Sequence, residues 1–121
     1  MEKTILIVDD SASIRNLVEF TLKDAGFHVI SASNGKEAKE FFDGTKIHLL
    51  LTDLHMPVMT GMELISEVRK MKDYKYLPIL FLTTETQVTI KQEAKKLGAT
   101  GWIVKPFNEK KLVNTIRKVI R

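Results

Sequence analysis

The chain has 121 residues, of which 44% are apolar and 28% charged, a composition typical of a single globular domain rather than a disordered segment. It contains no Cys, so disulfides and thiolate metal sites are excluded. No apolar run is long enough to cross a bilayer and the N-terminus carries no secretory signal, so we expect a soluble, cytoplasmic protein. The net charge of +4 is uneven: residues 1–85 carry 10 basic and 13 acidic side chains, and residues 86–121 carry 9 basic and 2 acidic ones.

Five short segments rich in bulky apolar residues are predicted to be strands. Uninterrupted apolar strands of this kind favour a parallel sheet that is covered on both faces. The predicted strands are Thr4–Val8, His28–Ala32, Leu49–Thr52, Ile79–Leu82 and Trp102–Val104.

The segments between these strands have helical periodicity. The second helix is expected to turn Phe41 and Phe42 inward. Strands that alternate with helices predict an α/β fold with a doubly wound parallel sheet, which binds ligands beyond the carboxyl ends of its strands. Helices are predicted over Ser13–Ala25, after Asn34 as a capping residue, over Met62–Met71 and Val88–Leu97, and after Asn108 as a capping residue.

Polar side chains follow four of the five predicted strands. Three carboxylates at one edge of a sheet repel one another, and Mg²⁺, which prefers oxygen ligands and keeps waters that a phosphate can displace, would relieve that repulsion. An ionised Asp can attack phosphorus, and an ammonium and a hydroxyl can stabilise the transferred group. The residues are Asp9 and Asp10 after the first strand, Asp53 after the third, Thr83 and Thr84 after the fourth, and Lys105 and Pro106 after the fifth.

Each of these residues, taken alone, has an ordinary structural explanation. Asp10 or Ser11 could cap the first helix, Thr83 could cap a helix that begins near Thr86, and Lys105 could be a solvated loop lysine. Their joint occurrence at the ends of neighbouring strands favours a common site.

Four motifs give the whole chain a resemblance to the response-regulator receiver family, and in particular to stand-alone chemotaxis regulators. The resemblance implies one receiver domain over residues 1–121 with a flavodoxin-like (βα)5 fold and strand order 2-1-3-4-5. The motifs are Ile7-Val8-Asp9-Asp10 followed by Arg15, the stretch Asp53–Gly61, Leu82-Thr83-Thr84-Glu85, and Val104-Lys105-Pro106-Phe107.

The resemblance also implies site roles. Asp53 corresponds to the phosphoacceptor, Lys105 to its ammonium partner, and Thr83 to the hydroxyl that follows the phosphoryl group. Asp10, Asp53 and the backbone carbonyl of His55 correspond to the direct Mg²⁺ ligands, and Asp9 to an acidic partner that acts through water.

Further positions match features that accompany the site in this family. Trp102 occupies the place of a switching aromatic residue, usually Tyr or Phe. His55 and Glu85 fall at two variable positions that tune how long the phosphoryl group lasts. The Lys105–Pro106 peptide bond is expected to be cis, and Gly61 is expected to permit a tight turn.

Three hypotheses about function follow. The leading one is a switch without enzymatic action on other substrates, which takes a phosphoryl group from a histidine kinase or a small phosphodonor and signals to a downstream protein through the Val88–Leu97 helix, the last strand and the last helix. An aspartate-nucleophile phosphatase is disfavoured, because such enzymes need a second Asp where this chain has His55. A receiver that belongs to a longer DNA-binding regulator stays open.

The remaining signals indicate structural roles. The lysines and arginines of the last two helices are expected first of all to form solvated helix faces. The second interpretation is that they form a docking surface for an acidic partner. Direct nucleic-acid binding is not expected, because no helix-turn-helix or aromatic stacking pattern accompanies the charge. Nucleotide-binding glycine loops are absent, and His28 and His48 lack a metal-ligand spacing to His55.

Overall fold

The computed structural model describes residues 2–120. Strands and helices alternate along the chain, as the sequence predicts. The elements are β1 (Thr4–Val8), α1 (Ala12–Asp24), β2 (His28–Ala32), α2 (Gly35–Lys39), β3 (Leu49–Thr52), α3 (Gly61–Arg69), the 3₁₀ turn η1 (Lys72–Tyr74), β4 (Ile79–Thr83), α4 (Val88–Leu97), β5 (Gly101–Val104) and α5 (Glu109–Val119).

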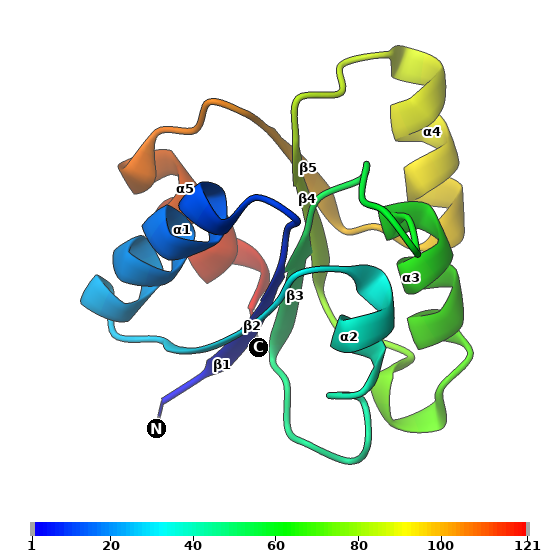
Figure 1. The fold of residues 1–121 in the computed structure, drawn as a ribbon, viewed down its shortest axis with the longest axis horizontal. Helices are drawn as coiled ribbons and strands as arrows, with labels where there is room; N and C mark the ends of the chain where they lie inside the picture. The colour runs from blue at the N-terminus through cyan, green and yellow to red at the C-terminus, as the bar shows by residue number, and fades with distance from the viewer. Residues whose placement is uncertain (1, 121) are drawn as a thin grey trace.

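The five strands form one sheet in the order β2-β1-β3-β4-β5, and every neighbouring pair is parallel. Helices α1 and α5 cover one face, and α2, α3 and α4 cover the other (Figure 1). The doubly wound α/β fold and its strand order are therefore confirmed. The first three predicted strands have the predicted bounds, β4 is longer by Thr83, and β5 begins one residue earlier at Gly101.

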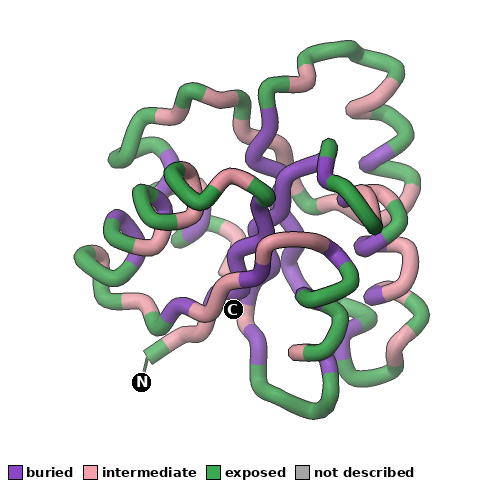
Figure 2. Tube along the Cα trace, in the orientation of Figure 1, coloured by how far each residue is buried: buried purple, intermediate pink, exposed green. Residues whose placement is uncertain are grey.

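The core consists of two apolar layers, one on each side of the sheet, and Figure 2 shows the central strands β1, β3 and β4 as its most buried part. Alternating side chains of β1 divide between the layers: Ile5 and Ile7 pack with α1 and α5, and Leu6 packs with α2, α3 and α4. All three are 2% exposed or less. This double burial explains why the central strands have no polar face in the sequence.

Both predicted helix caps are confirmed, because the side chain of Asn34 accepts from the Glu37 amide and that of Asn108 from the Lys111 amide. The first helix is capped by Ser11, one of the two residues considered for that role. No helix within residues 2–120 is both long enough and apolar enough to cross a membrane.

The second helix is shorter than its periodicity predicts, since α2 ends at Lys39, before Phe41 and Phe42. Phe42 instead packs edge-on against Tyr74, with ring centroids 4.8 Å apart. The hydroxyl of Tyr74 donates to the Thr45 carbonyl at 2.8 Å and accepts from the Gly44 amide at 2.9 Å. A contact with a residue about thirty positions away thus fixes this segment, and local helix propensity does not decide it.

Candidate functional site

Three carboxylates meet at the carboxyl edge of the sheet. Asp9 and Asp10 follow β1 and Asp53 follows β3, and these two strands are parallel neighbours. One side-chain oxygen from each of the three residues lies within 4.8 Å of the other two. Asp9 and Asp53 are 2% and 8% exposed, whereas Asp10 is exposed. A cluster of oxygen donors open to solvent on one side suits a hard cation such as Mg²⁺.

Lys105 bridges two of these carboxylates. Its ammonium donates to Asp9 Oδ2 at 2.7 Å and to Asp53 Oδ2 at 2.9 Å. Burial by itself lowers the pKa of Lys105, but the hydrogen bonds and charges of Asp9 and Asp53 outweigh burial and raise the pKa above its ordinary value. Lys105 is therefore held as a cation, and it balances only one of the three negative charges. The Lys105–Pro106 peptide bond is cis, as the resemblance implies.

The segment between β3 and α3 holds Asp53 by close backbone packing. Asp53 Oδ1 accepts from the Leu54 amide at 2.6 Å. Gly61 is the first residue of α3, and a Cβ at this position would overlap the Asp53 carbonyl oxygen and the Phe81 ring. Gly61 is thus required for a close approach and not for the expected tight turn. The residue of this segment with positive φ is Val58, at 72°.

His55 and Glu85 form a contact that sequence reasoning did not foresee. His55 Nε2 and Glu85 Oε1 are 3.0 Å apart and join the loop after β3 to the loop after β4. The other carboxylate oxygen of Glu85 accepts from the amides of Thr86 and Gln87, each at 3.2 Å. The hydrogen bond with His55, followed by the bond from the Gln87 amide, lowers the pKa of Glu85. The carboxylate therefore stays ionised and orders the start of α4.

Thr83 and Trp102 are linked through Glu85. The buried Thr83 hydroxyl accepts from the Glu85 amide at 3.2 Å, and the Trp102 indole N–H donates to the Glu85 carbonyl at 3.0 Å. The indole also packs on Phe81, at 5.4 Å between centroids, and lies under the Lys91 ammonium at 5.9 Å. Movement of Thr83 would therefore disturb the loop that holds Trp102.

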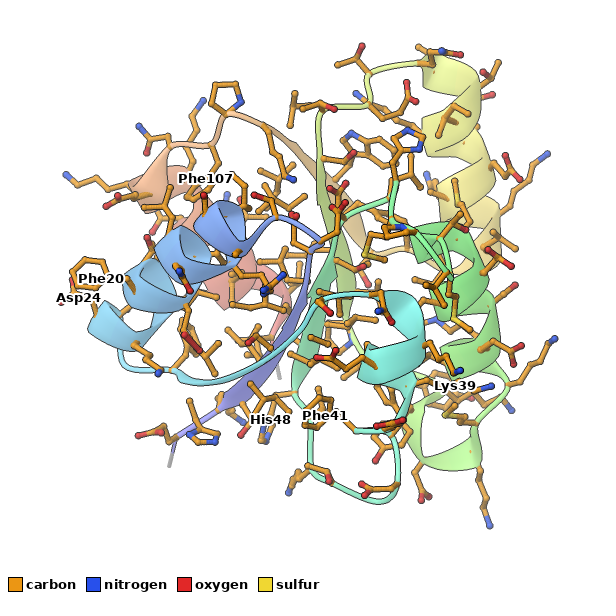
Figure 3. The ribbon with its side chains drawn as sticks, in the orientation of Figure 1. Phe20, Asp24, Lys39, Phe41, His48 and Phe107 are labelled. Carbon is orange, nitrogen blue, oxygen red and sulfur yellow. The ribbon has the colours of Figure 1, made fainter. Side chains whose placement is uncertain are left out.

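The two remaining histidines lie away from this site. His48 directly precedes β3, whose other end is followed by Asp53, and Figure 3 shows His48 well apart from Phe107, which follows the Lys105–Pro106 pair. His48 Nδ1 accepts from the Thr4 amide at 2.9 Å. Burial, together with the charges of Lys3 and Lys46, lowers the pKa of His48, so it stays neutral and structural.

Comparison with known proteins decides the family. The model of the response regulator receiver domain matches residues 5–117. The chain belongs to this family. A solved structure of the Vibrio cholerae chemotaxis protein CheY4 is 47% identical in sequence and superposes with a TM-score of 0.95. The match covers 98% of this receiver and 99% of the CheY4 chain. The Pseudomonas aeruginosa chemotaxis protein CheY is 36% identical over 116 residues, which is 95% of this chain and 94% of that protein.

Another group of relatives is longer. The probable transcriptional regulator ycf27 of Porphyridium aerugineum is 40% identical over 120 residues, which is 99% of this receiver but 49% of that protein. The receiver spans about half the length of the first curated relatives that it matches. Similarity therefore extends both to stand-alone chemotaxis regulators and to regulators with a further region.

The receiver fold brings together four of the residues predicted for the site: Asp9, Asp10, Asp53 and Lys105. Thr83, His55 and Trp102 each make a hydrogen-bond contact with Glu85. The chain is thus a response regulator receiver domain similar to CheY proteins. The roles of its individual residues remain predictions.

Proposed function

We propose that this receiver is a phosphorylation-activated switch of a two-component system, with Asp53 as the phosphoacceptor. One observation carries the proposal: the Asp53 carboxylate is almost buried at the end of β3, beside two other carboxylates and 2.9 Å from the Lys105 ammonium. An ionised carboxylate with fixed positive charge at hand is suited to attack phosphorus. The donor is a histidine kinase or a small phosphodonor, and the switch acts in the cytoplasm.

The chemistry uses few groups of the protein. An oxygen of Asp53 forms a bond to phosphorus while the bond from phosphorus to the donor breaks, which leaves an acyl phosphate. Lys105 already contacts Asp53 Oδ2 and balances the charge that arrives. Hydrolysis reverses the modification. A water oxygen forms a bond to phosphorus while the bond from phosphorus to the Asp53 oxygen breaks, which gives inorganic phosphate and the free Asp53 carboxylate. The chain acts on no other substrate in this proposal.

A divalent cation is part of the proposal, and the donor set fits Mg²⁺ because it consists of oxygen atoms on one solvent-facing edge. Asp10, Asp53 and the backbone carbonyl of His55 would hold the ion, and Asp9 would act through water. Bound Mg²⁺ supplies charge neutralisation of the phosphoryl oxygens.

The output follows from the contacts of Glu85. If Thr83 turns its hydroxyl toward the phosphoryl group, it gives up the bond from the Glu85 amide, and the loop that holds Trp102 shifts. Lys91, Lys95 and Trp102 line a hollow of about 270 Å³ between α4 and β5. An acidic effector protein, in a pathway such as chemotaxis, would bind this face of α4, β5 and α5 after a shift in population.

Labelling by acetyl phosphate tests the proposal. With Mg²⁺ present, the intact mass should rise by one phosphoryl group, and Asp53→Asn or an excess of chelator should abolish the rise. Equal labelling of Asp53→Asn would show that the acceptor is another residue. Undiminished labelling in chelator would remove the cation from the mechanism.

A second candidate is a receiver that controls a DNA-binding region of a longer regulator, which the half-length match to ycf27 favours. The full reading frame distinguishes it from a stand-alone switch. An aspartate-nucleophile phosphatase gains no support, since position 55 offers an imidazole engaged with Glu85 in place of a second carboxylic acid.

A further inference from the structure

Asp9 is held at every one of its polar atoms. Its amide donates to the Ala32 carbonyl at 3.2 Å, and its side chain accepts from the Ser11 amide at 2.9 Å and from Lys105 at 2.7 Å. Its backbone carbonyl accepts from Arg15 Nη1 at 2.6 Å. Within residues 2–120 the Arg15 guanidinium has no ion pair with a carboxylate, and its polar partner is this carbonyl.

Asp10 is held quite differently, although it belongs to the same cluster. Its side chain is exposed and makes no hydrogen bond with the described part of the chain. Only its backbone can therefore direct its carboxylate toward the site. The Asp9 carbonyl oxygen shares one rigid peptide plane with the nitrogen and Cα of Asp10. A group that fixes this oxygen therefore also fixes where the Asp10 Cα lies, and only rotations about the N–Cα and side-chain bonds of Asp10 are left to aim its carboxylate.

We propose that Arg15 is a positioning residue for the cation site: through the Asp9 carbonyl it holds the Asp10 backbone where the Asp10 carboxylate can serve as a ligand. The inference rests on the proposed function, since it needs a cation at the carboxylate cluster. A charged donor at 2.6 Å makes a stronger bond than a neutral one, and the nearly complete burial of Asp9 leaves water little room to replace it. Residues that orient metal ligands commonly change metal affinity by about 10- to 100-fold when they are removed.

The sign of the effect separates this role from simple electrostatics. Arg15 is a cation close to a site for cations, so its charge alone would repel the metal. If Arg15 acted only through its charge, its removal would tighten metal binding. If it positions Asp10, its removal weakens metal binding despite the relief of repulsion.

Mn²⁺ is the probe, because electron paramagnetic resonance counts the free ion directly in titrations of metal-free protein. Arg15→Met keeps an aliphatic stem but removes the donor, Arg15→Lys restores a charged donor, and Arg15→Gln supplies a neutral one. Asn16→Ala is the matched control on the exposed side of the same helix. We expect Arg15→Met to raise the Mn²⁺ dissociation constant about tenfold, Arg15→Lys to recover part of the loss, and Asn16→Ala to leave it unchanged.

Urea unfolding in chelator accompanies each titration, because a merely structural role would lower stability without changing the affinity of the folded protein. Unchanged or tighter Mn²⁺ binding by Arg15→Met overturns the positioning role and leaves the proposed function intact. A parent protein that binds no Mn²⁺ overturns the cation site and this inference together. If Arg15→Met does not fold, weaker binding by Arg15→Gln than by Arg15→Lys supports the role, and equal binding overturns it.

Discussion

Neutralising Asp10 should stabilise the metal-free protein. One carboxylate oxygen each of Asp9, Asp10 and Asp53 lies within 4.8 Å of the other two. Lys105 hydrogen-bonds to Asp9 and Asp53 but not to Asp10. Asp10→Asn therefore removes a charge that is repelled by two neighbours and breaks no side-chain hydrogen bond within residues 2–120.

The magnitude follows from the distances. Two like charges 4.8 Å apart repel by about 0.9 kcal/mol at the dielectric constant of water, which is the appropriate limit for the exposed Asp10. Its two neighbours together give about 1.7 kcal/mol. Attraction to Lys105 and to the N-terminus of α1, the latter about 0.3–1 kcal/mol, offsets part of this. We expect a net gain of less than about 1 kcal/mol in the free energy of unfolding.

Urea unfolding followed by the fluorescence of Trp102, the single tryptophan, measures this difference. In chelator, Asp10→Asn should have the higher midpoint and an unchanged slope. Saturating Mg²⁺ should stabilise the parent more than the variant, because only the parent keeps its full ligand set. Glu93→Gln, an exposed carboxylate in the middle of α4, is the control and should change little. A lower midpoint for Asp10→Asn in chelator would refute the reasoning from repulsion.

Three further predictions concern the groups around the carboxylates. Beryllofluoride, a stable mimic of the phosphoryl group, should together with Mg²⁺ change the emission of Trp102 or its quenching by iodide. Thr83→Ala should weaken that change. A constant signal despite confirmed binding of beryllofluoride would show that Trp102 is only a packed strand residue. His55→Ala and Glu85→Ala should each shorten the lifetime of the phosphoryl group by a factor of about 2 to 10. The double variant should have the same lifetime as the single variants, because each substitution removes the same contact. Additive effects would count against a shared role. The pKa of Lys105 is raised in the folded protein, so protonated Lys105 contributes stability that is complete below the ordinary lysine pKa of about 10.4 and is lost as the pH rises through the folded-state pKa. Lys105→Met should therefore reduce the fall in the free energy of unfolding at alkaline pH, measured by urea unfolding.

The sequence predicted the sheet well, because strands buried on both faces are apolar throughout and end where polar residues begin. The same property located the carboxylate cluster, since the ends of parallel neighbours must meet. Local signals also sufficed for the caps at Asn34 and Asn108.

Features that depend on contacts between distant segments were not predictable in this way. The early end of α2 depends on Phe42 meeting Tyr74, and the link between His55 and Glu85 spans 30 residues. Gly61 was expected to permit a tight turn, whereas it is required because the Asp53 carbonyl oxygen and the Phe81 ring leave no room for a Cβ. These neighbours in space cannot be known from the sequence alone.

Direct identification of the phosphorylated residue is the most decisive measurement. Reduction of the labelled protein with borohydride converts a phosphorylated aspartate to homoserine, which peptide mass spectrometry locates. The account predicts homoserine at position 53, none at positions 9 and 10, and none when Mg²⁺ is removed before labelling. Homoserine at position 9 or 10 with an intact Asp53 would contradict the account.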